Sequence, residues 1–181
     1  AIRHRKNPIY LTTIVGKPPQ EDFYLGKATE RIFLPLMRTQ LPEIIDMNMP
    51  AVGVFHNLVI ISIEKRFPMQ ARRLMNALWG MGQMSFVKTI IVFDQSVDIQ
   101  NTKKMIEILL NKIDFTRDLF FSEGILDVLN HASDKAIYGS KLGIDATTKI
   151  KGEEESKTKL ENSGKVALSL SENILERFTE F

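Results

Sequence analysis

The sequence predicts an α/β domain, in which helices flank a mixed, largely parallel sheet, followed by an amphipathic helix at the C-terminus. Three observations support this fold class. Short β-branched and apolar runs alternate with longer segments in which apolar residues recur at helical spacing. The runs at 58–63 and 86–93 are largely apolar, which is typical of strands covered on both faces. With 44% hydrophobic and 25% charged residues, the composition is that of an ordinary globular protein.

The first part of the chain is expected to hold three strands and one long helix. Residues 9–15 are rich in β-branched side chains and end at a Gly-Lys-Pro-Pro turn, so they are predicted to form a strand. Residues 43–47 and 58–63 are the next two candidates. Over 22–40, apolar residues recur every three or four positions, which predicts a helix. Pro35 should kink or loosen this helix because proline cannot donate the helical hydrogen bond.

The second part continues the alternation of helices and strands. A helix is predicted from Pro68, a residue suited to the first turn of a helix, to about Trp79. A strand at 86–93 and a helix at 102–113 follow, and a last short strand is expected at 119–121. Strands that alternate with helices in this way favour a layered α/β domain.

The composition divides the chain into three parts. We expect the α/β domain to occupy residues 1–149. Residues 150–164 include the charged run Lys-Gly-Glu-Glu-Glu-Ser-Lys at 151–157 and are predicted to form a solvated linker. Residues 165–181 repeat apolar side chains about every fourth position, which predicts an amphipathic helix that needs an apolar partner surface.

Charge and cysteine content exclude several classes of function. The 24 basic and 22 acidic residues are too evenly balanced to indicate a nucleic-acid partner. The absence of cysteine excludes disulfides, iron–sulfur clusters and thiolate metal sites, and it fits a cytoplasmic protein. No apolar run approaches the ~20 residues of a transmembrane helix. No glycine-rich phosphate loop follows any predicted strand, which disfavours a nucleotide-binding domain.

Few residue patterns point to chemistry of this chain's own. His56 has no second ligand at metal spacing and is expected to be structural. Glu43 and Asp46, three positions apart in an extended segment, should face opposite sides and act separately. Arg72 and Arg73 are expected to lie on the solvated face of their helix.

Two further segments and a methionine group have competing interpretations. Residues 123–127 follow a strand end, where α/β domains often build ligand contacts, and structural and functional roles are equally supported there. Residues 139–149, with two glycines, two lysines and an aspartate, are expected either to bind an anion or to turn the chain. Met75, Met81 and Met84 are expected to fill the core.

Five segments together resemble the C-terminal half of the UbiD decarboxylases. They are Gly16-Lys17-Pro18-Pro19, Tyr24-Leu25-Gly26, Pro42-Glu43-Ile44-Ile45-Asp46, Ala77-Leu78-Trp79-Gly80, and the run from Gly139-Ser140-Lys141 to Thr147. Their order and spacing resemble the family across residues 8–149. The resemblance implies a carboxy-lyase that decarboxylates a 4-hydroxybenzoate-type aromatic acid non-oxidatively in ubiquinone or menaquinone biosynthesis. Family members use prenylated FMN with Mn²⁺ and a monovalent cation.

The chain departs from the family in one large respect. The family's catalytic arginine, its paired acidic residues and its metal ligands have no match here, and all would precede Ala1. The resemblance therefore implies the C-terminal domain alone, inactive by itself and holding none of these cofactors. Its expected partners are an N-terminal flavin-binding domain and further copies, in a dimer or a higher homo-oligomer. A lipidic substrate would bring such a cytoplasmic enzyme to a membrane.

The resemblance also implies roles for a few residues. Leu25 should pack towards the substrate, and Ile125 and Leu126 should belong to a loop that closes over the same pocket. Lys141 and Asp145 match the last motif without an assigned role, and no catalytic or metal-binding residue is expected. The alternative is a free-standing protein-interaction module that assembles through its terminal helix and ignores flavin.

Overall fold

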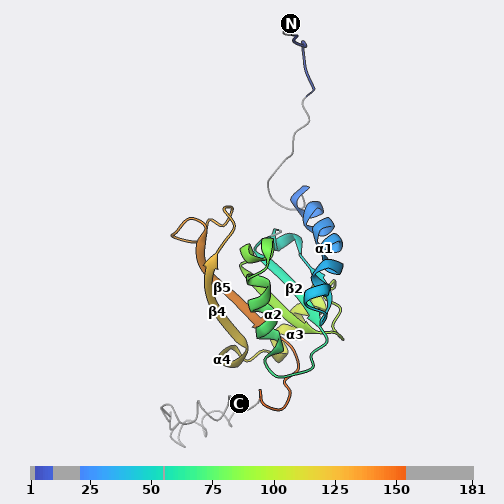
Figure 1. Cartoon of the computed structure of the whole chain (residues 1–181), viewed down its shortest axis with the longest axis vertical. Coiled ribbons are helices and arrows are strands. Elements are labelled where there is room, and N and C mark those ends of the chain that lie inside the picture. The colour runs from blue at the N-terminus through green and yellow to red at the C-terminus, as the bar shows by residue number, and fades with distance from the viewer. Residues whose placement is uncertain (1–2, 10–20, 55, 154–181) are drawn as a thin grey trace, which may run out of the picture. The chain divides into compact units, whose positions relative to one another are not determined.

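Figure 1 shows the computed structural model, which describes residues 3–9, 21–54 and 56–153. The chain divides into two compact units, Ala1–Thr148 and Lys149–Phe181, and the fold below is that of the first. The strand predicted at 9–15 and the helix predicted at 165–181 lie outside the described residues, apart from residue 9, which is not in a strand. Both stay predictions.

One five-stranded mixed sheet forms the centre of the first unit. Its strands are β1 Ile44–Asn48, β2 Leu58–Ile63, β3 Thr89–Asp94, β4 Leu119–Ile125 and β5 Tyr138–Asp145. They lie in the order β1-β2-β3-β5-β4. The central pairs β2–β3 and β3–β5 are parallel, and the two edge pairs are antiparallel. The predicted α/β class with a mixed sheet is confirmed.

Helices cover both faces of this sheet (Figure 1). They are α1 Glu21–Gln40, α2 Gln70–Trp79, α3 Thr102–Lys112, the short α4 Phe115–Asp118, and two 3-10 helices, η1 Ala51–Gly53 and η2 Gly82–Phe86. One buried cluster joins α1 and α2 to the sheet through residues such as Met37, Leu74 and Ile61. A second cluster on the other face includes Phe93 and Met105, so α3 covers that side.

Most predicted elements are present with small shifts in their ends. The runs at 43–47, 58–63 and 86–93 correspond to β1, β2 and β3, and α1 continues as one helix past Pro35. Helix α2 begins at Gln70, two residues after the proline. The side chain of Asn101 accepts a hydrogen bond from the Lys104 amide and thereby caps the N-terminus of α3. Asparagine is one of the residues favoured at this position of a helix.

The final part of the unit corrects two expectations. The strand predicted at 119–121 continues to Ile125, so most of the expected loop at 123–127 is strand. The run beginning at Gly139 neither turns the chain nor forms an anion-binding loop over its first part. It is β5, which lies between β3 and β4 and extends to Asp145.

The glycines of β5 have a packing role that explains its unusual composition. A Cβ at Gly143 would overlap the sulfur of Met75 and lie 3.4 Å from Trp79 Cη2. A Cβ at Gly139 would lie 2.9 Å from Leu126 Cδ1. Glycine weakens a strand in isolation, and here it lets α2 and the loop after β4 approach the sheet closely.

We predict that Gly143→Ala destabilises the domain by about 1–3 kcal/mol, because Met75 is fully buried and its sulfur has little room to move. Chemical denaturation would measure this loss. Gly80→Ala is the matched control, since its Cβ would meet only ordinary contacts at 3.5 Å or more. Equal stability of the two variants would contradict the close-packing role of Gly143.

Candidate functional site

A cleft opens between the start of α1 and the segment that leads from η2 into β3. Its volume is about 410 Å³, and we call it the Leu25 cleft. Its lining consists of Leu25, Gly26, Thr29, Met49, His56, Gln83, Met84, Phe86, Val87 and Asp127. Four separate stretches of chain therefore meet here, and most of the lining is apolar with a few polar groups, as in many ligand sites.

The structure brings together only part of the predicted pocket lining. Leu25 lines the cleft and is 63% exposed. Leu126 is 1% exposed and does not line the cleft, whereas its neighbour Asp127 does. Ile125 ends β4 with a half-exposed side chain and is not among the lining residues. His56 is buried as expected, but it also lines the cleft, which its sequence context did not indicate.

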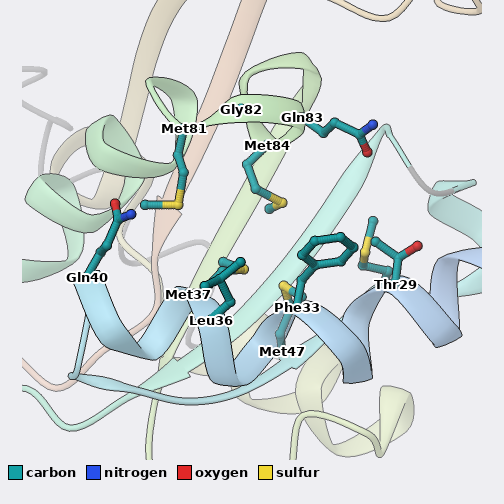
Figure 2. Close-up of a pocket in the computed structure, with 11 residues that line it drawn as sticks. Thr29, Phe33, Leu36, Met37, Gln40, Met47, Met81, Gly82, Gln83 and Met84 are labelled. Atoms are coloured by element: carbon teal, nitrogen blue, oxygen red, sulfur yellow. The ribbon is translucent and has the colours of Figure 1, made fainter.

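A second pocket adjoins the cleft and is rich in methionine. It holds about 240 Å³ and is lined by Thr29, Phe33, Leu36, Met37, Gln40, Met47, Met49, Met81, Gly82, Gln83 and Met84. Figure 2 shows Met81, just before η2, and Met84 of η2 pointing across the pocket towards α1, with the end of Met81 beside Gln40. Met75 is core, as predicted, whereas Met81 and Met84 pack against the core and also line this pocket. Methionine suits such a wall because its flexible thioether adapts to irregular space.

One wall shared by both pockets is held by the buried carboxylate of Glu30. Its Oε2 accepts a hydrogen bond from the Met49 amide at 2.6 Å and one from Lys27 Nζ at 3.0 Å. Arg31 Nη2 lies 2.7 Å from the other oxygen. Met49 lines both pockets, so this carboxylate fixes the backbone of the wall. Buried carboxylates are stabilised only when paired and hydrogen-bonded in this way.

A second carboxylate, Asp46 on β1, extends the same network towards the surface. Asp46 Oδ1 pairs with Arg31 Nη1 at 2.8 Å, and Oδ2 accepts from Gln100 Nε2 at 3.0 Å. Burial would raise the pKa of Asp46, but the hydrogen bonds from Gln100 and Arg31 outweigh it and lower that pKa. Glu43 forms its ion pair with Arg73 instead. Glu43 and Asp46 therefore have separate partners, as expected.

The arginines of α2 are at least partly exposed, in agreement with the predicted solvated face, but both make contacts that the sequence did not indicate. Arg73 is half exposed yet forms an ion pair with the buried Glu43. Arg72 donates to the carbonyl of Arg117 at 3.2 Å and lies over the ring of Phe120. Both side chains therefore bind neighbouring elements rather than extending freely into solvent. A helix pattern alone places arginine on the outer face and cannot show what that face meets.

The two unassigned residues of the last motif are both buried and make structural contacts. Lys141 Nζ donates to the carbonyl oxygens of Ser85 and Val87. Burial lowers the pKa of Lys141 to about 8. Asp145 Oδ1 accepts from the amide and the hydroxyl of Thr147, which closes the end of β5. Sequence reasoning missed these roles because burial of the two residues depends on tertiary packing.

The lining of the Leu25 cleft does not fit the cofactors that the resemblance implies. Among residues 3–9, 21–54 and 56–153, no three histidine or carboxylate side chains gather closely enough to hold a metal ion. The part of the cleft lining that these residues form includes no lysine or arginine that could receive a flavin phosphate. Within the same ranges no helix is long and apolar enough to span a membrane.

We predict that Glu30→Gln lowers the free energy of unfolding by about 2 kcal/mol, because it removes the charge that Lys27 and Arg31 face. Urea denaturation would measure the change. Glu64→Gln is the control, since its pair with Arg66 is exposed and should contribute little. Equal effects of the two substitutions would show that the buried network does not stabilise the wall.

Lys141 should make stability rise with pH in a defined window. The unfolded chain holds this proton up to its ordinary pKa near ~10.4, whereas the folded chain releases it near 8. Between these values the unfolded state binds more protons, so the free energy of unfolding increases with pH by up to about 1.4 kcal/mol per unit. In Lys141→Met this contribution should vanish. Parallel stability curves for the two proteins from pH 7 to 10 would contradict the prediction.

Comparisons with known proteins agree with this architecture. A family model described as the 3-octaprenyl-4-hydroxybenzoate carboxy-lyase C-terminal domain matches residues 23–146. An uncharacterized protein of Aquifex aeolicus is 51% identical over 153 residues, which are 84% of this chain and 32% of the relative. One of Archaeoglobus fulgidus is 46% identical with the same coverage. The chain thus spans about a third of the length of these relatives.

Solved structures show the same fold. Vanillic acid decarboxylase of Sedimentibacter hydroxybenzoicus in its closed form superposes with a TM-score of 0.72 at 24% identity, over 88% of this chain and 37% of that one. An evolved dimeric form of the UbiD-class enzyme HmfF from Pelotomaculum thermopropionicum, in complex with prenylated FMN, has a TM-score of 0.58 at 26% identity, over 81% and 31% of the chains. Since the family model matches more than half of its residues, this chain belongs to the UbiD family, whose C-terminal domain it carries.

Proposed function

We propose that this domain forms one wall of the active site in a UbiD-like decarboxylase and also mediates assembly of that enzyme. The proposed reaction is the non-oxidative loss of CO₂ from a 4-hydroxybenzoate-type aromatic acid in quinone biosynthesis. Prenylated FMN, Mn²⁺ and a monovalent cation are proposed to be held by an N-terminal flavin-binding domain. The Leu25 cleft carries the proposal, because it joins Leu25 to Asp127 in the segment after β4, and the family resemblance implies that both regions contribute to the substrate pocket.

The chemistry of the cleft suits an aromatic acid. Leu25, Phe86 and Val87 offer apolar surface to a ring, while a small number of polar side chains can fix its orientation. Loss of CO₂ from a carboxylate leaves its electron pair and its negative charge on the organic fragment, where the charge is dispersed until that fragment takes up a proton. An apolar wall that excludes water disfavours the localised charge more than the dispersed charge of the transition state.

Related proteins support the substrate class and the cofactor. The vanillic acid decarboxylase that shares this fold acts, by its name, on an aromatic acid. HmfF was observed with prenylated FMN and in a dimeric form. In this chain, α1 exposes the apolar side chains of Tyr24, Ile32 and Leu36, a surface that suits burial against another subunit.

The role of Leu25 can be tested in a chimera. Residues 23–146 would replace the matching segment of the Aquifex aeolicus relative, and the protein would be loaded with prenylated FMN and Mn²⁺. A panel of aromatic acids, including 4-hydroxybenzoate and vanillate, is then assayed for CO₂ release beside the parent relative. We expect Leu25→Ala to lower kcat/KM by about tenfold or more, because it removes apolar contact in the substrate pocket.

Leu110→Ala is the matched control for this experiment. Leu110 lies on α3 and is 73% exposed, close to the 63% of Leu25, but it lines no part of the cleft and lies outside the α1 surface proposed for assembly. Its substitution should leave kcat/KM unchanged within about twofold. A chimera that folds, retains flavin and fails to convert an acid accepted by the parent would refute the active-site role. That result would favour the free-standing interaction module.

A further inference from the structure

Lys141 occupies an unusual position for a lysine. It lies in the middle of β5, is 3% exposed, and extends from the sheet towards η2. Two neighbours accommodate it. A Cβ at Gly124 would come within 3.1 Å of Lys141 Cε, so a glycine there leaves space for the side chain. The ring of Trp79 lies 5.7 Å from the ammonium, a distance that permits a cation–π interaction.

The ammonium of Lys141 forms hydrogen bonds with two backbone carbonyl groups at the end of η2. It donates to the carbonyl oxygens of Ser85 and of Val87, the latter at 3.0 Å. Trp79 Nε1 donates to the same Val87 oxygen, also at 3.0 Å. The last carbonyls of a helical turn have no partner within that turn, so they need donors from elsewhere. Here β5 and α2 supply them.

The carbonyl groups that accept hydrogen bonds from Lys141 lie next to the wall of the Leu25 cleft. Phe86 lies between Ser85 and Val87, and both Phe86 and Val87 line the cleft. We propose that Lys141 is a positioning residue that forms a clamp together with Trp79: the two side chains hold the Ser85–Val87 segment so that Phe86 and Val87 keep their places on the cleft wall. The consequence for catalysis rests on the proposed function. The positioning itself rests only on the contacts described above.

The chemistry explains why an amine stands at this position. Burying a lysine is unfavourable, and burial lowers the pKa of Lys141 to about 8. Both the ammonium and the neutral amine have at least two N–H groups, so either form can donate to both carbonyls. An apolar side chain of equal size would avoid the desolvation but would take this donor from the Ser85 carbonyl and leave the Val87 carbonyl with Trp79 Nε1 alone. A buried polar group left without a partner costs about 1–3 kcal/mol.

A chemical substitution tests the amine without changing the shape of the side chain. The chain contains no cysteine, so Lys141→Cys introduces a unique thiol. Alkylation of the unfolded variant with 2-bromoethylamine, with loss of bromide, gives a side chain that differs from lysine only by sulfur in place of one methylene. Alkylation with 1-bromopropane gives the same shape with a methyl group where the amine would be. Both products are then refolded.

Hydrogen exchange separates positioning from general stability. In the propyl form we expect exchange at the amides of 84–87 to be about tenfold faster, while β2 and β3 keep their rates. The aminoethyl form should restore slow exchange. Equal exchange in the two forms, or a rise that is as large in β2 and β3 as in 84–87, would overturn the proposal.

Trp79→Phe keeps the test decisive if the propyl form does not refold. This variant removes one of the two donors to the Val87 oxygen and retains Lys141. We expect exchange to rise a fewfold, about two- to fivefold, at the same amides and not in the central strands. Unchanged exchange at 84–87 in Trp79→Phe would overturn the clamp.

The chimera connects the clamp to catalysis. Lys141→Met should raise KM by about five- to tenfold with kcat within about twofold, because a displaced wall weakens binding of substrate and transition state alike. Lys88→Met is the control, since its Nζ donates to Asn130 outside the cleft lining. If the unmodified chimera does not decarboxylate, the proposed function fails, and exchange in the 181-residue chain still decides the clamp.

Discussion

The Leu25 cleft depends on buried ionisable side chains that pair with backbone groups outside the helices and strands. Glu30 accepts the amide of Met49 just after β1, and Lys141 donates to the carbonyls at the end of η2. Connecting segments usually satisfy such groups with water, because they lie on the surface. Here the side chains that pair with them are buried, with Glu30 1% and Lys141 3% exposed. A charged or amine group on a neighbouring element therefore fixes each wall in a defined place.

The last motif gains a physical meaning from this arrangement. Its first glycine makes room for Leu126 and its second for Met75, so the loop after β4 and helix α2 both pack tightly on β5. Its lysine anchors η2, and its aspartate closes the strand end through Thr147. The two glycines and the lysine thus set the distance from β5 to its neighbours, while the aspartate ends the strand. The motif acts as a packing template, with no contact of its own in the cleft lining.

The parts of the fold that could be predicted are those in which the buried positions are apolar residues with a regular spacing in the sequence. The runs at β2 and β3 and the periodicity of α1 and α2 identify these elements without tertiary information. Strand β5 could not be found in this way, because glycine and lysine are depleted in ordinary strands. The cleft was missed for another reason. Its lining comes from four separated stretches, and side chains such as Met49 and Phe86 become neighbours only when the sheet has formed.

The family resemblance and the geometry of the cleft both suggest that this domain positions a substrate while another part of the enzyme supplies the cofactor chemistry. Along the described residues the cleft has apolar surface, a few polar groups and firmly held walls, but it has no cationic residue for a phosphate and no cluster of metal ligands. Such a surface can bind and orient an aromatic acid but cannot by itself accept the electron pair left by CO₂. Rigid walls are what a site of this kind needs, because orientation contributes to catalysis only when the reacting groups are held in place. Buried anchors such as Glu30 and Lys141 therefore fit a domain whose role is to position a substrate against chemistry supplied from elsewhere.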